Sequence, residues 1–166
     1  MNILYIHGFK SQFKEQSAKV QALNKLGKVF GVTLDYTNAF KEIKNILHKF
    51  VLDKDIDLVV GTSLGGYYSS IIGDGFTFTG DAYTLKKETI TTYPGFALEG
   101  CGLILLDRGD KLINSEETLS TLENFYGTRI FEGGNHRFEH INESLREIED
   151  FFERPSLVYG FGADDD

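Results

Sequence analysis

Ser63 has the setting of a catalytic nucleophile, because residues 61–65 read Gly-Thr-Ser-Leu-Gly and match the motif Gly-x-Ser-x-Gly. A serine hydroxyl attacks a carbonyl carbon efficiently only when a neighbouring base removes its proton. In this motif the serine occupies a sharp turn from a strand into a helix, which points its oxygen into an open site. The apolar run over residues 56–60 suits the strand. The motif is short, so its meaning depends on whether a base and an acid follow it.

A histidine and an acid follow Ser63 in suitable places. One apolar run, over residues 101–106, leads into an acidic turn, and a later run, over residues 128–131, leads into a Gly-Gly turn before His136. The order serine, acid, histidine, with each group after a strand, is the α/β-hydrolase arrangement of a catalytic triad. We therefore predict a serine hydrolase in which Asp110 orients His136 and His136 takes the proton of Ser63.

The acidic turn offers two candidates for the triad acid. Asp110 is favoured over Asp107, because Gly109 lets the chain bend and direct the Asp110 carboxylate back to the site. In the alternative interpretation Asp110 caps the following turn or helix. Asp107 then either serves as the acid or pairs with Arg108 on the surface.

The remaining histidines are alternatives of lower rank. His140 lies one helical turn beyond His136 and is the second choice for the base. His48 falls within an amphipathic segment and is expected to be a solvated helical residue.

The first apolar run ends in a turn that suits an oxyanion hole. Acyl transfer needs two backbone N–H groups that bind the oxygen on which negative charge develops. One comes from the residue after the nucleophile, which is Leu64, and the other from the loop after an early strand, where Phe9 follows Gly8. We expect His7 to hold this loop by hydrogen bonds rather than to act as a base. The alternative is that residues 7–9 form an ordinary turn with no role in catalysis.

Apolar and amphipathic segments alternate along the chain, which predicts an α/β fold with a mostly parallel central sheet flanked by helices. Strands are expected over residues 2–7, 28–36, 56–60, 101–106 and 128–131. Helices are expected over residues 11–26, 40–52, 64–72, 116–125 and 142–152. We predict a single domain over residues 1–155 and a flexible acidic tail over residues 156–166.

Composition narrows the class of protein. The chain has 166 residues and a net charge of −8, which argues against nucleic acid as a partner because such partners require a basic face. No apolar run approaches the roughly 20 residues of a membrane span. The first residues lack the features of a signal peptide, which predicts a cytoplasmic protein. The single cysteine, Cys101, excludes an internal disulfide and is expected to be a buried apolar residue.

The motifs together resemble those of the YqiA-like small esterases of the α/β-hydrolase superfamily. The resemblance rests on residues 5–9, 61–68, 109–112 and 132–138, in the family's order. It implies a compact, minimal α/β-hydrolase fold and the triad of Ser63, Asp110 and His136. It also implies hydrolysis of carboxylic esters or acyl thioesters through an acyl-serine intermediate, with a small-molecule substrate and without cofactor or metal.

Residues 73–100 depart from the family's pattern. Similar proteins carry an Asn-Pro-Ala turn and a proline-rich stretch there, whereas this chain is rich in threonine and aromatic residues. We interpret the interval as a divergent insert or a rebuilt strand region that lines the acyl pocket. Tyr93 and Phe96 of this interval are therefore candidate substrate-binding residues, and the alternative is that such rings pack the core. Tyr67, in the segment after Ser63, is a further candidate. A non-catalytic binding or regulatory protein on the same scaffold is the alternative function. The acyl chain, the leaving group and the oligomeric state stay open.

Overall fold

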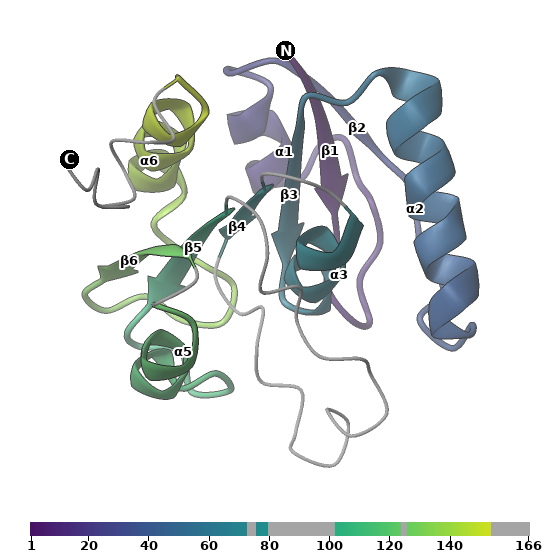
Figure 1. The fold of residues 1–166 in the computed structure, drawn as a ribbon. Helices are drawn as coiled ribbons and strands as arrows, with labels where there is room; N and C mark the ends of the chain where they lie inside the picture. The colour runs from purple at the N-terminus through teal and green to yellow at the C-terminus, as the bar shows by residue number, and fades with distance from the viewer. Residues whose placement is uncertain (73–75, 80–101, 124–125, 154–166) are drawn as a thin grey trace, which may run out of the picture.

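The computed structural model describes residues 1–72, 76–79, 102–123 and 126–153 (Figure 1). Within these residues six strands form one sheet in the order β2-β1-β3-β4-β5-β6, and each neighbouring pair is parallel. The strands are β1 (Asn2–Ile6), β2 (Lys28–Gly31), β3 (Leu58–Thr62), β4 (Phe76–Thr79), β5 (Gly102–Asp107) and β6 (Gly127–Phe131). Because the strands are parallel, the loops after them meet at one edge of the sheet, where such folds bind ligands.

Helices flank the sheet, as the sequence predicts. They are α1 (Ala18–Leu23), α2 (Phe40–Lys54), α3 (Leu64–Ile72), α5 (Ser115–Leu122) and α6 (Ile141–Glu153). One core cluster joins α1 and α6 to the strands, with Ile3, Leu58, Val60, Leu103 and Leu105 among its fully buried members. A second cluster joins α2 and α3 to the strand residues between these, with Leu4, Ile6, Val59, Ile43 and Leu47 buried. Alternate residues of a strand thus face opposite layers.

The first helix is shorter than expected, because the chain does not continue the helical pattern before residue 18. Ser17 caps α1, since its Oγ accepts a hydrogen bond from the N–H of Val20. Phe13, which the helical spacing assigned to this helix, packs over Gly31 of β2, where any added Cβ would overlap its ring. The expectation of a helix over residues 11–17 is therefore wrong.

The second strand also ends early. Residues 28–36 were expected to form it, but β2 stops at Gly31. The N–H of Leu34 donates to the imidazole of His7 rather than to a neighbouring strand, which draws the chain away from the sheet.

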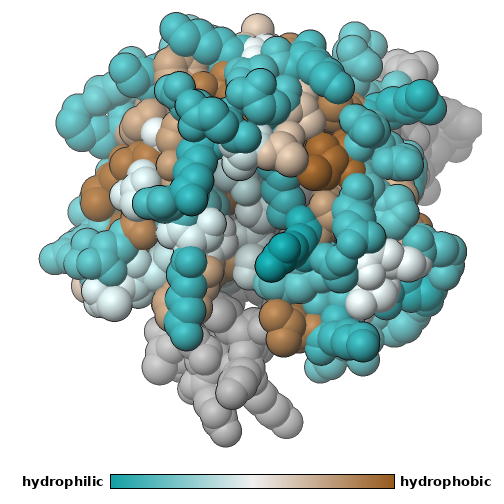
Figure 2. Space-filling model, turned by 180° about the vertical axis from the view of Figure 1, so that it is seen from behind, coloured by the Kyte–Doolittle hydropathy of each residue, from teal (hydrophilic) through white to brown (hydrophobic). Residues whose placement is uncertain are grey.

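The threonine-rich interval contributes a strand. Phe76–Thr79 forms β4, which pairs with β3 on one side and β5 on the other. The other expectations for this interval, and those for Cys101 and the tail over residues 156–166, lie outside the described residues. In the described part, no helix is both long enough and apolar enough to cross a membrane. Figure 2 shows a mainly hydrophilic surface on the rear of the molecule, with smaller hydrophobic areas between.

Candidate active site

Ser63 occupies the turn between β3 and α3, which is the strand–turn–helix setting that its motif predicts. Its backbone φ is +54°, a conformation that residues other than glycine rarely adopt. The Ser63 carbonyl accepts a hydrogen bond from the N–H of Gly66 at 2.9 Å, so α3 begins immediately after the serine. A Cβ on Gly65 would overlap the carbonyl oxygen of Ile6, so the turn packs directly on β1. Such strain is typical of functional sites.

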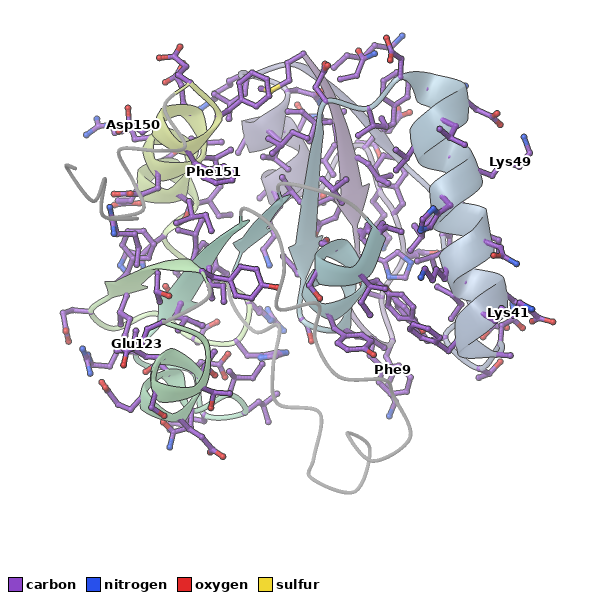
Figure 3. All side chains as sticks on the ribbon, viewed as in Figure 1. Phe9, Lys41, Lys49, Glu123, Asp150 and Phe151 are labelled. Carbon is purple, nitrogen blue, oxygen red and sulfur yellow. The ribbon has the colours of Figure 1, made fainter. Side chains whose placement is uncertain are left out.

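The loop after β1 lies against this turn. A Cβ on Gly8 would be 2.9 Å from the Cβ of Ser63 and 3.2 Å from the carbonyl oxygen of Thr62. Gly8 and Ser63 are therefore in contact. The two proposed oxyanion donors are the N–H groups of the residues that follow them, Phe9 and Leu64. Phe9 itself is 53% exposed and projects from the edge at which β1 and β3 end (Figure 3).

His7 is a scaffold residue of that loop. Its Nε2 accepts a hydrogen bond of 2.8 Å from the N–H of Leu34, so its Nδ1 carries the proton and donates to the carbonyl of Gly8, also at 2.8 Å. The hydroxyl of Tyr36 donates to the carbonyl of His7. Burial lowers the pKa of His7, which favours the neutral ring that these bonds require. The hydrogen-bonding role expected for His7 is present.

His136 and Asp110 form a direct pair at the same edge of the sheet. The Nδ1 atom of His136 lies 2.9 Å from Oδ2 of Asp110. The Asp110 side chain is 1% exposed, and its Oδ1 accepts hydrogen bonds from the N–H groups of Leu112 and Ile113 at 2.7 and 3.0 Å. A histidine that donates from Nδ1 to a carboxylate presents Nε2 as its basic nitrogen. The pair thus has the polarity of a general base and its orienting acid.

The second acid, Asp107, is paired with the second histidine. Its Oδ1 lies 2.7 Å from Nδ1 of His140, and its side chain is fully buried. Arg108 does not pair with Asp107 but forms ion pairs with Glu116 and Glu132. The structure therefore separates the two candidates for each role into two distinct Asp–His pairs.

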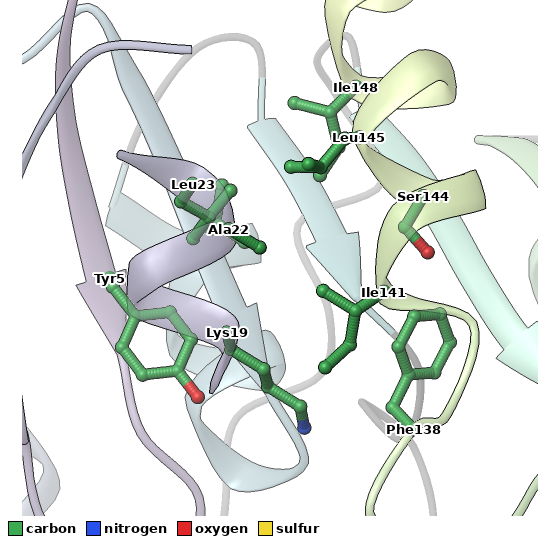
Figure 4. A pocket seen from close by; sticks show the side chains of 10 residues that line it. Tyr5, Lys19, Ala22, Leu23, Phe138, Ile141, Ser144, Leu145 and Ile148 are labelled. Carbon is green, nitrogen blue, oxygen red and sulfur yellow. The ribbon is translucent and has the colours of Figure 1, made fainter. Parts of the chain in front are cut away.

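The segment after β6 turns back toward the serine. Phe138 is buried and lines one small apolar pocket together with Tyr5 of β1 and Val60 of β3 (Figure 4). The ammonium of Lys19 lies 5.9 Å from the centre of the Phe138 ring. Because β6 is at the end of the sheet, and β3 and β1 are three and four strands away from it, the segment that carries Phe138 crosses the edge of the sheet. It carries His136 toward the strand that Ser63 follows.

Among known protein families, the model of an uncharacterised protein family, UPF0227, matches residues 2–80 of this chain. The curated relatives include the UPF0227 protein YcfP of Escherichia coli O9:H4 (strain HS). That protein is 24% identical over 178 aligned residues, which cover 90% of this chain and 97% of YcfP. The resemblance to the YqiA-like family that the sequence predicts is confirmed by these matches.

Solved structures define the architecture. An α/β-hydrolase enzyme from the sediment metagenome of the Mar Chica lagoon, Morocco, superposes with a TM-score of 0.70 at 14% identity, covering 92% of this chain and 90% of that one. Est1E from Butyrivibrio proteoclasticus superposes with a TM-score of 0.68 at 14% identity, covering 94% and 88%. The protein has the α/β-hydrolase fold. At these identities the likeness concerns the fold alone.

Of the three predicted substrate-binding residues, the structure describes only Tyr67. Tyr67 is 4% exposed and packs against Phe40 and Tyr68, with ring centres 6.3 and 5.5 Å apart. Its ring belongs to the core in the described part of the chain, and a contact with substrate stays a prediction. Tyr93 and Phe96 lie outside the described residues.

Sequence reasoning missed a buried hydrogen bond beside the nucleophile. The hydroxyl of Tyr5 lies 2.8 Å from Oγ1 of Thr62, the residue before Ser63. Burial raises the pKa of Tyr5, so its phenol stays neutral and can share this bond. The available signal was a tyrosine in a strand predicted to be buried, because a buried phenol needs a partner.

Proposed function

We propose that the protein is a serine esterase or thioesterase that hydrolyses carboxylic esters or acyl thioesters of small molecules. The observation that carries the proposal is the 2.9 Å contact between His136 and Asp110, which lie after β6 and β5 at the sheet edge where Ser63 follows β3. The strained turn at Ser63 and the hydrolase scaffold support it further.

The proposed reaction has two halves. Nε2 of His136 removes the proton of Ser63 as Oγ attacks the acyl carbonyl carbon, and the N–H groups of Phe9 and Leu64 bind the resulting oxyanion. His136 then gives its proton to the leaving alcohol or thiol, which leaves an acyl-serine. Water, deprotonated by His136, attacks this ester. As the second intermediate collapses, His136 returns the proton to Oγ of Ser63, which releases the carboxylic acid and restores both residues.

Asp110 supports both halves electrostatically. In each half His136 becomes a cation, and a carboxylate 2.9 Å from its Nδ1 stabilises that charge. The two backbone N–H groups that bind Oδ1 hold the carboxylate in place, so that its other oxygen faces the ring. No movement of Asp110 is needed during the reaction.

The substrate is proposed to approach over Phe9. This side chain is 53% exposed next to the proposed oxyanion donors, and it shares a surface hollow with Leu34 and Tyr36. An exposed aromatic ring at that point suits the apolar part of an acyl or aryl group.

The test is covalent labelling with a fluorophosphonate, read as the mass of the intact protein. Wild type should gain one adduct, Ser63→Ala none, and Ser120→Ala one, because Ser120 is an exposed serine of α5 whose hydroxyl donates to the carbonyl of Glu117 and has no base beside it in the proposed mechanism. With a small aryl ester, Ser63→Ala should lower kcat on the order of 10⁴- to 10⁶-fold.

Two results would contradict the proposal. Activity of Ser63→Ala within about tenfold of wild type would exclude Ser63 as the nucleophile. A folded wild-type protein that takes up no label and turns over no ester would favour the alternative function, a binding or regulatory protein on the hydrolase scaffold.

A further inference from the structure

The buried Asp107 holds the segment that carries His136 at three points. Its Oδ2 accepts hydrogen bonds from the N–H groups of Asn135 at 3.3 Å and Glu139 at 2.9 Å. Its Oδ1 binds Nδ1 of His140 at 2.7 Å. These three partners lie on both sides of His136 in the sequence, so one carboxylate at the end of β5 anchors both ends of the short segment around the proposed base.

Glycines allow the loops after β5 and β6 to come this close. A Cβ on Gly134 would overlap the carboxylate of Asp107, and a Cβ on Gly109 would overlap the carbonyl oxygen of Gly134. The N–H of Gly109 donates to the carbonyl of Gly133 at 2.6 Å. The two loops are thus joined through backbone as well as through Asp107.

His140 extends this anchor to the helix that follows. Its ring stacks on Phe131 with centres 5.0 Å apart and planes inclined by 15°. Its carbonyl accepts hydrogen bonds from the N–H and the hydroxyl of Ser144 in the first turn of α6. The His140 side chain therefore joins Asp107 at the end of β5 to Phe131 of β6, and the His140 carbonyl adds the link to the start of α6.

We propose that Asp107 and His140 are positioning residues for the base His136, a second Asp–His pair that holds the ring of the first. The proposal rests on the proposed hydrolase function and deepens it. Asp107 is fully buried, and both of its carboxylate oxygens are bonded to the segment over residues 135–140. It therefore acts through His136 and does not touch the substrate. Its loss frees the segment over residues 135–140, and His136 then samples orientations away from Asp110.

Asp107→Asn tests this with little change of size. The amide replaces one carboxylate oxygen with an NH2 donor, which faces either the N–H groups of Asn135 and Glu139 or Nδ1–H of His140, so the present set of three bonds is not kept. We expect kcat per active site, counted by fluorophosphonate titration, to fall about 10- to 100-fold, while KM stays within about twofold, because displacement of a catalytic group by about 1 Å costs about that much. Titration separates this from a smaller folded fraction.

Glu132→Gln is the matched control. Glu132 is an exposed carboxylate on the same loop, and its partner in the structure is Arg108 rather than a neighbour of His136. We expect wild-type kcat and KM from this variant.

If Asp107→Asn does not fold, two variants of His140 are compared instead. His140→Gln keeps a donor toward Asp107, and His140→Phe keeps only the ring stacking. The positioning role predicts that kcat of His140→Gln lies closer to wild type.

The second readout does not depend on activity. Long-range ¹⁵N–¹H spectra of the imidazole report which nitrogen of His136 is protonated. Wild type should show the Nδ1–H form, and the folded Asp107→Asn or His140→Phe protein should show a mixture of the two tautomers. An unchanged His136 spectrum in those variants, or an unchanged kcat per active site, would overturn the positioning role. Absence of turnover in wild type with the tautomer change present would overturn only the hydrolase function.

Discussion

Gly8 lies directly against Ser63: a Cβ on Gly8 would be 2.9 Å from the Cβ of the serine and 3.5 Å from its Oγ. This contact joins the loop after β1 to the turn after β3, and each of the two proposed oxyanion donors belongs to the residue that follows one of the two residues in contact. Hydrogen bonds from the N–H of Leu34 to the His7 ring and from the Tyr36 hydroxyl to the His7 carbonyl hold this loop in place. The site thus depends on a close approach of the Gly8 backbone to Ser63, which leaves no room for a side chain at position 8.

Gly8→Ala should therefore lower activity by displacing one side of the oxyanion hole. The added methyl group has to move Ser63 or the loop by a few tenths of an ångström, and such overpacking costs about 1–3 kcal/mol of stability. We expect kcat to fall at least about tenfold with the fold retained, measured with an aryl ester and by urea unfolding. Ser11→Ala, an exposed change in the same loop, serves as the control. A Gly8→Ala protein with wild-type kcat would show that the loop does not contribute to the site.

Asp110→Asn should remove the electrostatic support of His136 and leave the loop in place. The amide oxygen can still accept the N–H groups of Leu112 and Ile113, but the amide nitrogen then faces Nδ1 of the ring and favours the wrong tautomer. By analogy with other triads we expect a loss of kcat of about 10⁴-fold. Asp53→Asn, at an exposed aspartate of α2 that pairs with Lys49, should behave as wild type. A loss below about tenfold in Asp110→Asn would transfer the role of the acid to another residue.

The pKa of His7 predicts how stability depends on pH. Burial lowers this pKa, so the unfolded chain binds a proton at His7 more readily than the folded protein does. The stabilising effect of a neutral His7 is complete above the ordinary pKa of about 6.5 and decreases as the pH falls below it toward the folded-state pKa.

We therefore expect His7→Gln to be less stable than wild type at pH 8 and to lose less stability between pH 7.5 and pH 5. The measurement is the free energy of unfolding in urea at each pH. His48→Gln, which removes an exposed histidine of α2, should keep the wild-type dependence. Equal slopes for wild type and His7→Gln would mean that protonation of His7 does not couple to folding.

The parts of the fold that the sequence predicts are those with a strong local pattern. Continuous apolar runs mark β1, β3 and β5, because strands of a parallel sheet are buried on both faces. The pattern was misleading over residues 11–17 and 32–36. There the conformation depends on the packing of Phe13 over Gly31 and on the bond from Leu34 to His7, which join residues far apart in the sequence.

The same distinction applies to the site. The order of the motifs was sufficient to nominate Ser63, Asp110 and His136, because each follows an apolar run at the edge where parallel strands end. The pairing of Asp107 with His140 was not predictable, since it depends on the approach of Gly109 to Gly134, 25 positions later. The burial of Tyr67 likewise depends on Phe40, which a neighbouring helix supplies.

The hydrogen bond between Tyr5 and Thr62 predicts a coupled effect on stability next to the nucleophile. Tyr5→Phe leaves the buried hydroxyl of Thr62 without this partner, and Thr62→Val does the same to the phenol of Tyr5, so each change should cost about 1–3 kcal/mol. The double variant removes both polar groups and should be more stable than the sum of the two losses predicts, by at least about 0.5 kcal/mol. Urea unfolding of the four proteins measures this coupling. Strictly additive losses would mean that the bond between Tyr5 and Thr62 does not contribute to folding.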